Sequence, residues 1–142
     1  AHALNMFTDG VRMAMPWLLA AQQSAGGWWA EMIYSVGAGI YEELVFRLMA
    51  IALLHFVSVY LINLDNLTGS VIAIVCAAVL FAAYHFNSVA EVTAVRFLFF
   101  TLAGIYLGGI FALRGFGIVV AVHMFYDIFY VLIQYDLVPI RT

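Results

Sequence analysis

Four long apolar stretches limit what this chain can fold into. They run from about Trp28 to Ile62, Gly69 to Phe86, Ala94 to Leu113 and Ile118 to Tyr135. Each is close to or above the roughly 20 helical residues that cross a hydrocarbon core of about 30 Å. Only 9% of the residues are charged and 67% are hydrophobic, which leaves too little polar surface for a water-soluble domain. The sequence therefore predicts an all-α, multi-pass transmembrane helix bundle with about four core spans.

Shorter features complete the predicted architecture. Val11–Ala21 is apolar but interrupted by a proline, which indicates a short or interfacial N-terminal helix or the remnant of another span. The first span is longer than one crossing needs, and Gly37 and Gly39 favour a bend or a new start within it. The lone cysteine, Cys76, is predicted to be a small buried hydrophobe. We expect residues 1–142 to form a single domain, integral to a cell or inner membrane.

The charge pattern excludes one class of partner. The net charge is -3, and the basic residues are isolated arginines without any lysine. Nucleic-acid binding needs a basic patch, and none is present. The arginines are also too few to orient the protein by the positive-inside rule. The expected partners are the lipid bilayer and a peptide or lipidated protein substrate.

Ionisable residues inside apolar spans are costly, so they are functional candidates by default. Glu42, Glu43 and Arg47 lie together at the point where the first span becomes continuously apolar. Glu43 and Arg47 are four residues apart, which makes them neighbours on one helix face that can neutralise each other. Glu42 is rotated by about 100° from Glu43 and has no cation at helical spacing. We expect its carboxylate to reach a polar cavity and to carry the chemistry.

Two later spans add polar groups that can join this carboxylate. His85 closes the second span, and His123 with Asp127 forms a pair four residues apart on the fourth. A glutamate beside histidines in a partly dry cavity can activate water, which predicts hydrolysis. For any one residue, a buried ion pair or a hydrogen-bonded core histidine is the structural alternative. His55, alone on an apolar face, is interpreted as structural or snorkelling.

The order of these residues resembles a known family. Glu42-Glu43-x-x-x-Arg47, Phe81-x-x-x-His85 and His123-x-x-x-Asp127 are similar to the EExxxR, FxxxH and HxxxN or HxxxD motifs of the CAAX-protease and bacteriocin-processing (CPBP) intramembrane peptidases. The motif-bearing core covers about residues 37–131. The combination, in this order and on successive hydrophobic segments, is far more specific than any single motif.

The resemblance implies a glutamic-type intramembrane endopeptidase that cuts a membrane-associated or prenylated protein or peptide. It implies that Glu42 is the general base and that His85 helps to position the attacking water. His123 and Asp127 would stabilise the oxyanion, and Glu43 with Arg47 would support the site structurally.

Asp127 leaves the mechanism open at one point. An ionised carboxylate cannot donate a hydrogen bond to an oxyanion, so Asp127 must be protonated, orient His123 or help to bind a metal. Glu42, His85, His123 and Asp127 could together hold zinc by residue type. The histidines lack the close spacing of a helical zinc motif, so no cofactor is the favoured expectation and zinc the alternative.

Two further functions compete with proteolysis. One is a catalytically silent CPBP-like scaffold subunit of a larger membrane complex, which would have a closed site. The other is a haem- or pigment-binding protein with histidine axial ligands, although such a site has no need for Glu42 and Glu43.

The depths of the site residues add a geometric condition. In straight spans Glu42 and His85 fall near one membrane face, and His123 lies only about 9 Å from the other. The site closes if the fourth helix is tilted or if Asn87–Thr93 dips into the membrane. We expect that it closes.

Overall fold

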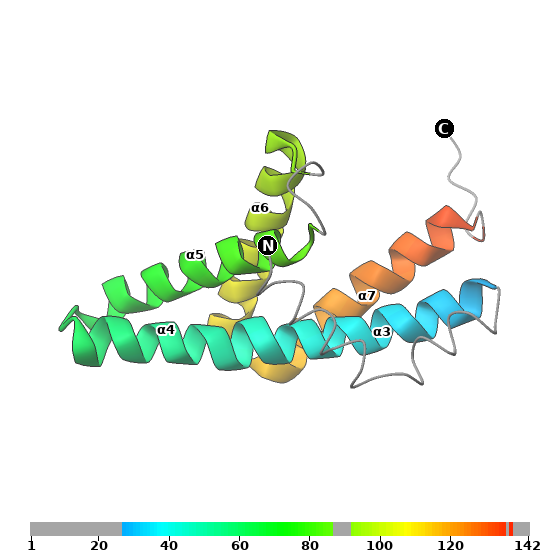
Figure 1. Ribbon diagram of the computed structural model, residues 1–142. Coiled ribbons are helices and arrows are strands. Elements are labelled where there is room, and N and C mark those ends of the chain that lie inside the picture. The colour runs from blue at the N-terminus through cyan, green and yellow to red at the C-terminus, as the bar shows by residue number, and fades with distance from the viewer. Residues whose placement is uncertain (1–26, 87–91, 136, 138–142) are drawn as a thin grey trace, which may run out of the picture. The chain divides into compact units, whose positions relative to one another are not determined.

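The structure, a computed structural model, describes residues 27–86, 92–135 and 137, and every regular element among them is a helix (Figure 1). Four of these helices are long and apolar enough to cross a membrane, which confirms the predicted all-α, multi-pass class. In chain order, the elements are α3 (Trp28–Glu43), η1 (Leu44–Ile51), α4 (Ala52–Phe56), η2 (Val57–Leu61), α5 (Asn66–Tyr84), α6 (Ala94–Arg114) and α7 (Phe116–Gln134). The predicted helix at Val11–Ala21 lies outside the described residues.

The first span is one unbroken helix from Trp28 to Leu61. The expected new start at Gly37 and Gly39 is wrong, because both glycines lie inside α3, and the alternative of a bend there stays a prediction. In lipid the backbone must satisfy its own hydrogen bonds, so continuing the helix costs less than opening it. The departure from α-helical geometry comes later, in the two π-helical segments η1 and η2.

The turn before α5 has a clear cause in its sequence. Asn63 adopts a positive φ of 65°, a conformation that asparagine tolerates better than most residues. Asp65 then caps α5, since its Oδ1 accepts hydrogen bonds from the backbone N–H groups of Leu67 at 3.1 Å and Thr68 at 3.0 Å. The hydrogen bonds from Thr68 hold the pKa of this exposed carboxyl below its ordinary value.

The chain divides into two compact units, residues 1–38 with 124–142 and residues 39–123. In the first unit, Tyr135 donates a hydrogen bond of 2.7 Å from its hydroxyl to Glu31 Oε1. The second unit holds the end of α3, the helices from η1 to α6 and the start of α7.

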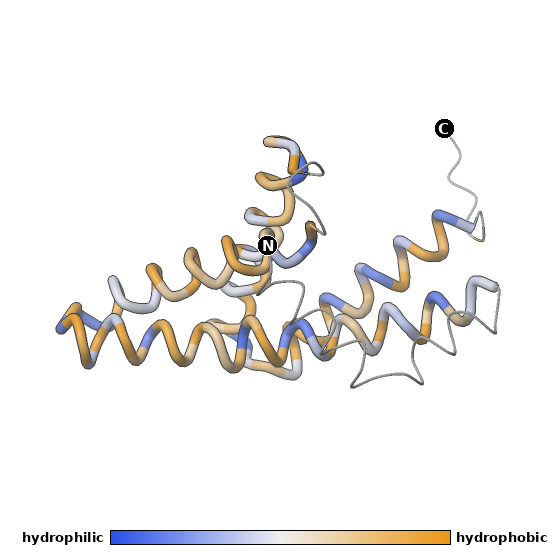
Figure 2. Tube along the Cα trace, viewed as in Figure 1, coloured by the Kyte–Doolittle hydropathy of each residue, from blue (hydrophilic) through white to orange (hydrophobic). Residues whose placement is uncertain are grey.

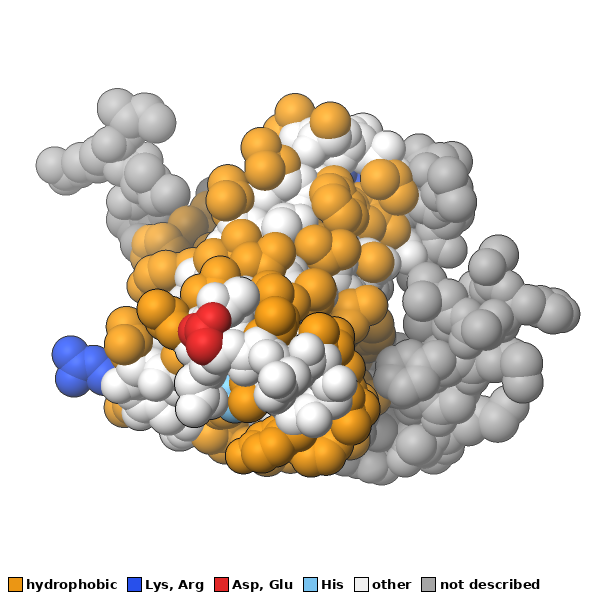
Figure 3. Space-filling view, turned by 90° about the vertical axis from the view of Figure 1, so that its left-hand side faces the viewer, with side chains coloured by type: hydrophobic (Ala, Val, Ile, Leu, Met, Phe, Trp, Pro, Cys, Tyr) orange, Lys and Arg blue, Asp and Glu red, His pale blue; other side chains and the backbone are white. Residues whose placement is uncertain are grey.

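Apolar residues follow the helices along most of their length (Figure 2), and hydrophobic side chains cover much of the face drawn in Figure 3. Large apolar side chains such as Leu53, Phe56 and Tyr60 are exposed, so the helices present an apolar surface. A lipid solvent explains it, because such a surface would associate non-specifically in water.

Small residues form the buried face of α5. Gly69, Ala73, Ala77 and Phe81 follow one another at intervals of four, and all four are buried. This spacing places them on one helix face, where small side chains allow neighbouring helices to approach closely. Cys76 lies off this face and is exposed, so its prediction as a buried residue is wrong.

Helix α6 approaches α5 closely and crosses it steeply (Figure 1). A Cβ atom added at Gly104 would lie 2.9 Å from the Cα of Ala78, so the two backbones are nearly in contact. One at Gly108 would lie 2.8 Å from the Ile74 side chain. The glycines of α6 therefore set its distance from α5.

This contact predicts opposite results for two alanine substitutions in α6. Gly104→Ala should lower the thermal stability of the purified protein in detergent, because its methyl group meets backbone and overpacking costs about 1–3 kcal/mol. Gly109→Ala is the matched control, since nothing lies within 4 Å of an added Cβ there and alanine favours helix. Equal melting temperatures for the two variants would contradict the close packing.

Candidate active site

Glu43 and Arg47 form a buried ion pair where α3 passes into η1. Arg47 Nε lies 3.2 Å from Glu43 Oε2, and the two side chains are only 1% and 0% exposed. The four-residue spacing predicted this contact. Charges so far from water are stable only when they are paired, so each residue depends on the other.

The guanidinium of Arg47 also lies against an aromatic ring. Its central carbon is 4.5 Å from the ring centroid of Phe81 on α5, within the range of a cation–π interaction. Its two terminal nitrogens have no hydrogen-bond acceptor within the described part of the chain. Glu43 and the Phe81 ring are therefore its principal described partners, and the Phe81 side chain is itself buried.

A second hydrogen bond connects Glu43 to the far end of the sequence. His123 Nδ1 lies 2.7 Å from Glu43 Oε1, and both side chains are buried. A carboxylate paired with Arg47 can only accept, so His123 Nδ1 carries the proton and donates. Arg47, Glu43 and His123 thus form a continuous buried chain of contacts.

His85 is fixed by the helix that precedes it. It follows the last residue of α5, and its Nδ1 lies 2.8 Å from the carbonyl oxygen of Phe81. A carbonyl oxygen only accepts, so Nδ1 donates, and Nε2 of the neutral ring carries a lone pair. The spacing of the Phe81-x-x-x-His85 motif has this physical reason, because a carbonyl four residues earlier is within reach at a helix C-terminus.

Glu42 stands between the two imidazoles. Its Oε2 lies 3.8 Å from Nε2 of His85 and 3.8 Å from Nε2 of His123. Both distances exceed a direct hydrogen bond but suit a bridging water or substrate atom. Glu42 is 13% exposed and His85 22%, so this end of the cluster is more open than the ion pair beneath it.

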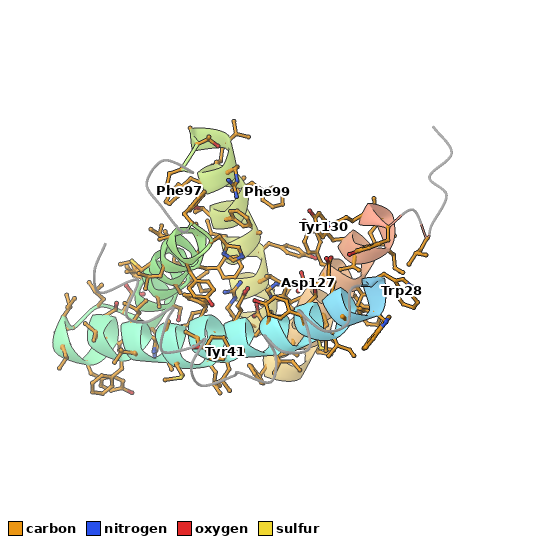
Figure 4. All side chains as sticks on the ribbon, turned by 45° about the vertical axis from the view of Figure 1, so that its right-hand side comes forward. Trp28, Tyr41, Phe97, Phe99, Asp127 and Tyr130 are labelled. Carbon is orange, nitrogen blue, oxygen red and sulfur yellow. The ribbon has the colours of Figure 1, made fainter. Side chains whose placement is uncertain are left out.

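The structure gathers five of the six residues selected from the sequence within the unit of residues 39–123: Glu42, Glu43, Arg47, His85 and His123. Asp127 follows His123 by four residues on α7 (Figure 4) but belongs to the other unit. Its role stays a prediction.

His123 reaches Glu43, so the separation in depth expected of straight, parallel spans does not arise. The steep crossing of α6 and the turn at Gly115, which has a φ of 84°, precede α7 and contribute to this arrangement. Most of Asn87–Thr93 lies outside the described residues, so its expected dip into the membrane stays a prediction.

Two contacts were missed at the sequence level. Glu43 was assigned to Arg47 alone, although it also binds His123. Phe100 on α6 stacks on the His85 ring with 4.1 Å between the ring centroids. The four-residue spacing of Phe100, Gly104 and Gly108 was the available signal, because it puts Phe100 on the face of α6 that packs against α5.

The zinc alternative requires several His, Cys, Asp or Glu side chains to converge on one point. Among the described residues, no group of three His, Cys, Asp or Glu side chains is placed to hold a metal ion. His123 Nδ1 is engaged by Glu43, and His85 Nδ1 by a backbone carbonyl. The zinc alternative stays a prediction, and the mechanism proposed below uses only protein groups and water.

Transmembrane helices and an internal cluster of carboxylates and histidines define the class: an integral, multi-pass membrane protein with a buried polar site. A family model described as type II CAAX prenyl endopeptidase Rce1-like matches residues 24–129. The chain belongs to this family of CAAX-type intramembrane proteases, which confirms the resemblance to the CPBP peptidases. No curated protein and no solved structure matches it. Its partners are, in general terms, the lipid bilayer and a peptide substrate.

The ion pair generates a prediction about stability. Arg47→Met should lower the melting temperature strongly, because removing one partner of a buried pair leaves an uncompensated charge and costs about 3–5 kcal/mol. The double variant Arg47→Met with Glu43→Gln removes both charges and should recover part of the loss. Thermal unfolding in detergent measures both, and a double variant less stable than Arg47→Met would contradict the pairing.

Proposed function

We propose that this protein hydrolyses a peptide bond of a membrane-associated or prenylated protein or peptide, with a water molecule activated by Glu42 and His85. The observation that supports this is the position of Glu42 Oε2, 3.8 Å from both His85 Nε2 and His123 Nε2. A carboxylate between two imidazoles provides a base and hydrogen-bonding groups at one point, as amide hydrolysis requires.

The attacking water lies between Glu42 and His85 in this proposal. The Glu42 carboxylate accepts one of its hydrogens, and the lone pair on His85 Nε2 accepts the other. That lone pair is available because His85 donates through Nδ1 to the Phe81 carbonyl. As the water oxygen bonds to the substrate carbonyl carbon, its proton passes to Glu42.

His123 stabilises the oxyanion that forms. Its Nδ1 proton is donated to Glu43, so Nε2 can donate only when the ring is a positively charged imidazolium. The carboxylates of Glu43 on one side and Glu42 on the other favour that charged ring. The imidazolium then meets the developing negative charge, which is an electrostatic contribution to catalysis.

Collapse of the tetrahedral intermediate completes the reaction. The proton taken up by Glu42 passes to the leaving nitrogen, the carbon–nitrogen bond breaks, and a carboxylic acid and an amine are released. Glu42 returns to its ionised state. Every proton is accounted for by the protein and one water, so the cycle requires no metal.

Substitution of Glu42 and His85 tests the proposed water activation directly. The assay measures cleavage, in liposomes, of a panel of fluorescence-quenched peptides that are membrane-anchored or prenylated. Glu42→Gln and His85→Gln should each lower kcat by at least about a hundredfold, because general base catalysis contributes 10²–10⁴-fold. His55→Gln, a histidine on α4 away from the cluster, should keep wild-type activity.

The same assay repeated with a chelator distinguishes the glutamic mechanism from a zinc-dependent one. Activity that survives chelation and disappears in both cluster variants supports the glutamic mechanism. Activity that is lost with chelator and restored by zinc would overturn it. No cleavage by the wild type would favour the scaffold alternative.

Asp127 is tested by two substitutions of similar size. Asp127→Asn should retain most activity, since an amide can donate a hydrogen bond to an oxyanion and the family motif accepts either residue. Asp127→Leu should reduce kcat by roughly ten- to a thousandfold if this side chain stabilises the transition state. Equal activity in both variants would remove Asp127 from the proposed machinery.

A further inference from the structure

The imidazole of His85 is enclosed by aromatic rings from two helices. Phe100 on α6 stacks on it with a centroid distance of 4.1 Å and an interplanar angle of 27°. Phe81 on α5 meets it at 4.5 Å and 58°, and Tyr84 lies at its edge at 5.9 Å. Phe100 is the ring nearest to parallel with the imidazole among these contacts, and it is outside the three sequence motifs.

The crossing of α5 and α6 brings Phe100 to this position. Phe100, Gly104 and Gly108 share one face of α6, and the two glycines approach Ala78 and Ile74 on α5. The near-contact of the backbones at Gly104 brings the preceding turn of α6 close to the end of α5, where His85 lies. Phe86 meets the Phe100 ring edge-on at a centroid distance of 5.9 Å.

Two constraints are needed to fix the direction of an imidazole ring. The hydrogen bond from Nδ1 to the Phe81 carbonyl determines which edge of the ring faces the helix end. It leaves the ring able to swing about that hydrogen bond. A stacked neighbour removes this freedom, because offset stacking keeps the planes of the two rings nearly parallel. Nε2 is then directed towards Glu42 Oε2.

We propose that Phe100 is a positioning residue that holds His85 in the orientation required to activate water. The inference rests on the proposed hydrolytic function and adds a residue to it. Phe100 touches no reacting atom, and its effect acts through the direction of the His85 lone pair. A tilt of the ring moves that lone pair away from the water shared with Glu42, and small misplacements are costly in catalysis.

The kinetic test uses conservative variants. Phe100→Leu should lower kcat by roughly ten- to a hundredfold with KM within about twofold of the wild type. Phe100→Tyr keeps the aromatic face and should restore most of the activity. Phe99→Leu is the matched control. Phe99 is 51% exposed and leaves α6 on a different side from Phe97 in Figure 4. Its ring contacts Phe100, but no ring contact with His85 is found among the described residues. A Phe100→Leu enzyme with wild-type kcat, or a Phe99→Leu enzyme equally impaired, would overturn the proposal.

A second readout does not depend on activity. A ring stacked at this distance shifts the proton resonances of the imidazole upfield, and histidine-labelled protein in detergent shows them by NMR, with His85→Gln as the assignment control. The upfield shift should be present in the wild type and in Phe100→Tyr and should disappear in Phe100→Leu. Its absence from the wild type refutes the stacking whatever the enzyme does. If the shift is present but no substrate is cleaved, the proposed function has failed and not the contact.

Discussion

The buried chain of contacts from Arg47 through Glu43 to His123 is the constraint on which the rest of the site depends. None of these charged or polar groups could remain alone in a medium that lacks water. Glu43 contacts both neighbours, one with each carboxylate oxygen. The contact ties residues 80 positions apart and leaves the adjacent Glu42 turned towards two imidazoles. The buried ion pair holds the cluster in place, and the more exposed Glu42 and His85 are accessible to water and substrate.

The polar cluster requires helices that come unusually close, and small side chains make this possible. Along α5 the buried face is made of glycine and alanine until it ends in Phe81, and α6 presents glycines to it. In lipid there is little hydrophobic gain from bringing two apolar helices together, so van der Waals contact between backbones has to provide the attraction. The same small residues that hold α5 and α6 together therefore also determine which side chains reach His85.

Local patterns in the sequence were enough to predict the spans, the Glu43–Arg47 pair and the residues of the cluster. Each follows from helical spacing or from the cost of charge in an apolar segment. The hydrogen bond from His123 to Glu43 and the stacking of Phe100 could not be predicted, because they depend on how distant helices cross. The errors over a new helix start at Gly37 and Gly39 and over the burial of Cys76 have the same origin, because both features depend on how neighbouring helices pack.

The π-helical segment η1, which follows Glu43 directly, has a consequence for the evolution of the chain. A π-helical turn is closed by hydrogen bonds between residues five apart, so it contains more residues than an α-helical turn. Deleting one residue beyond Arg47 would convert this stretch back towards α-helix and rotate α4 and η2 relative to the glutamates. The registry between the carboxylates and the far end of the first span can thus change by a single codon, while Glu42, Glu43 and Arg47 keep their mutual spacing.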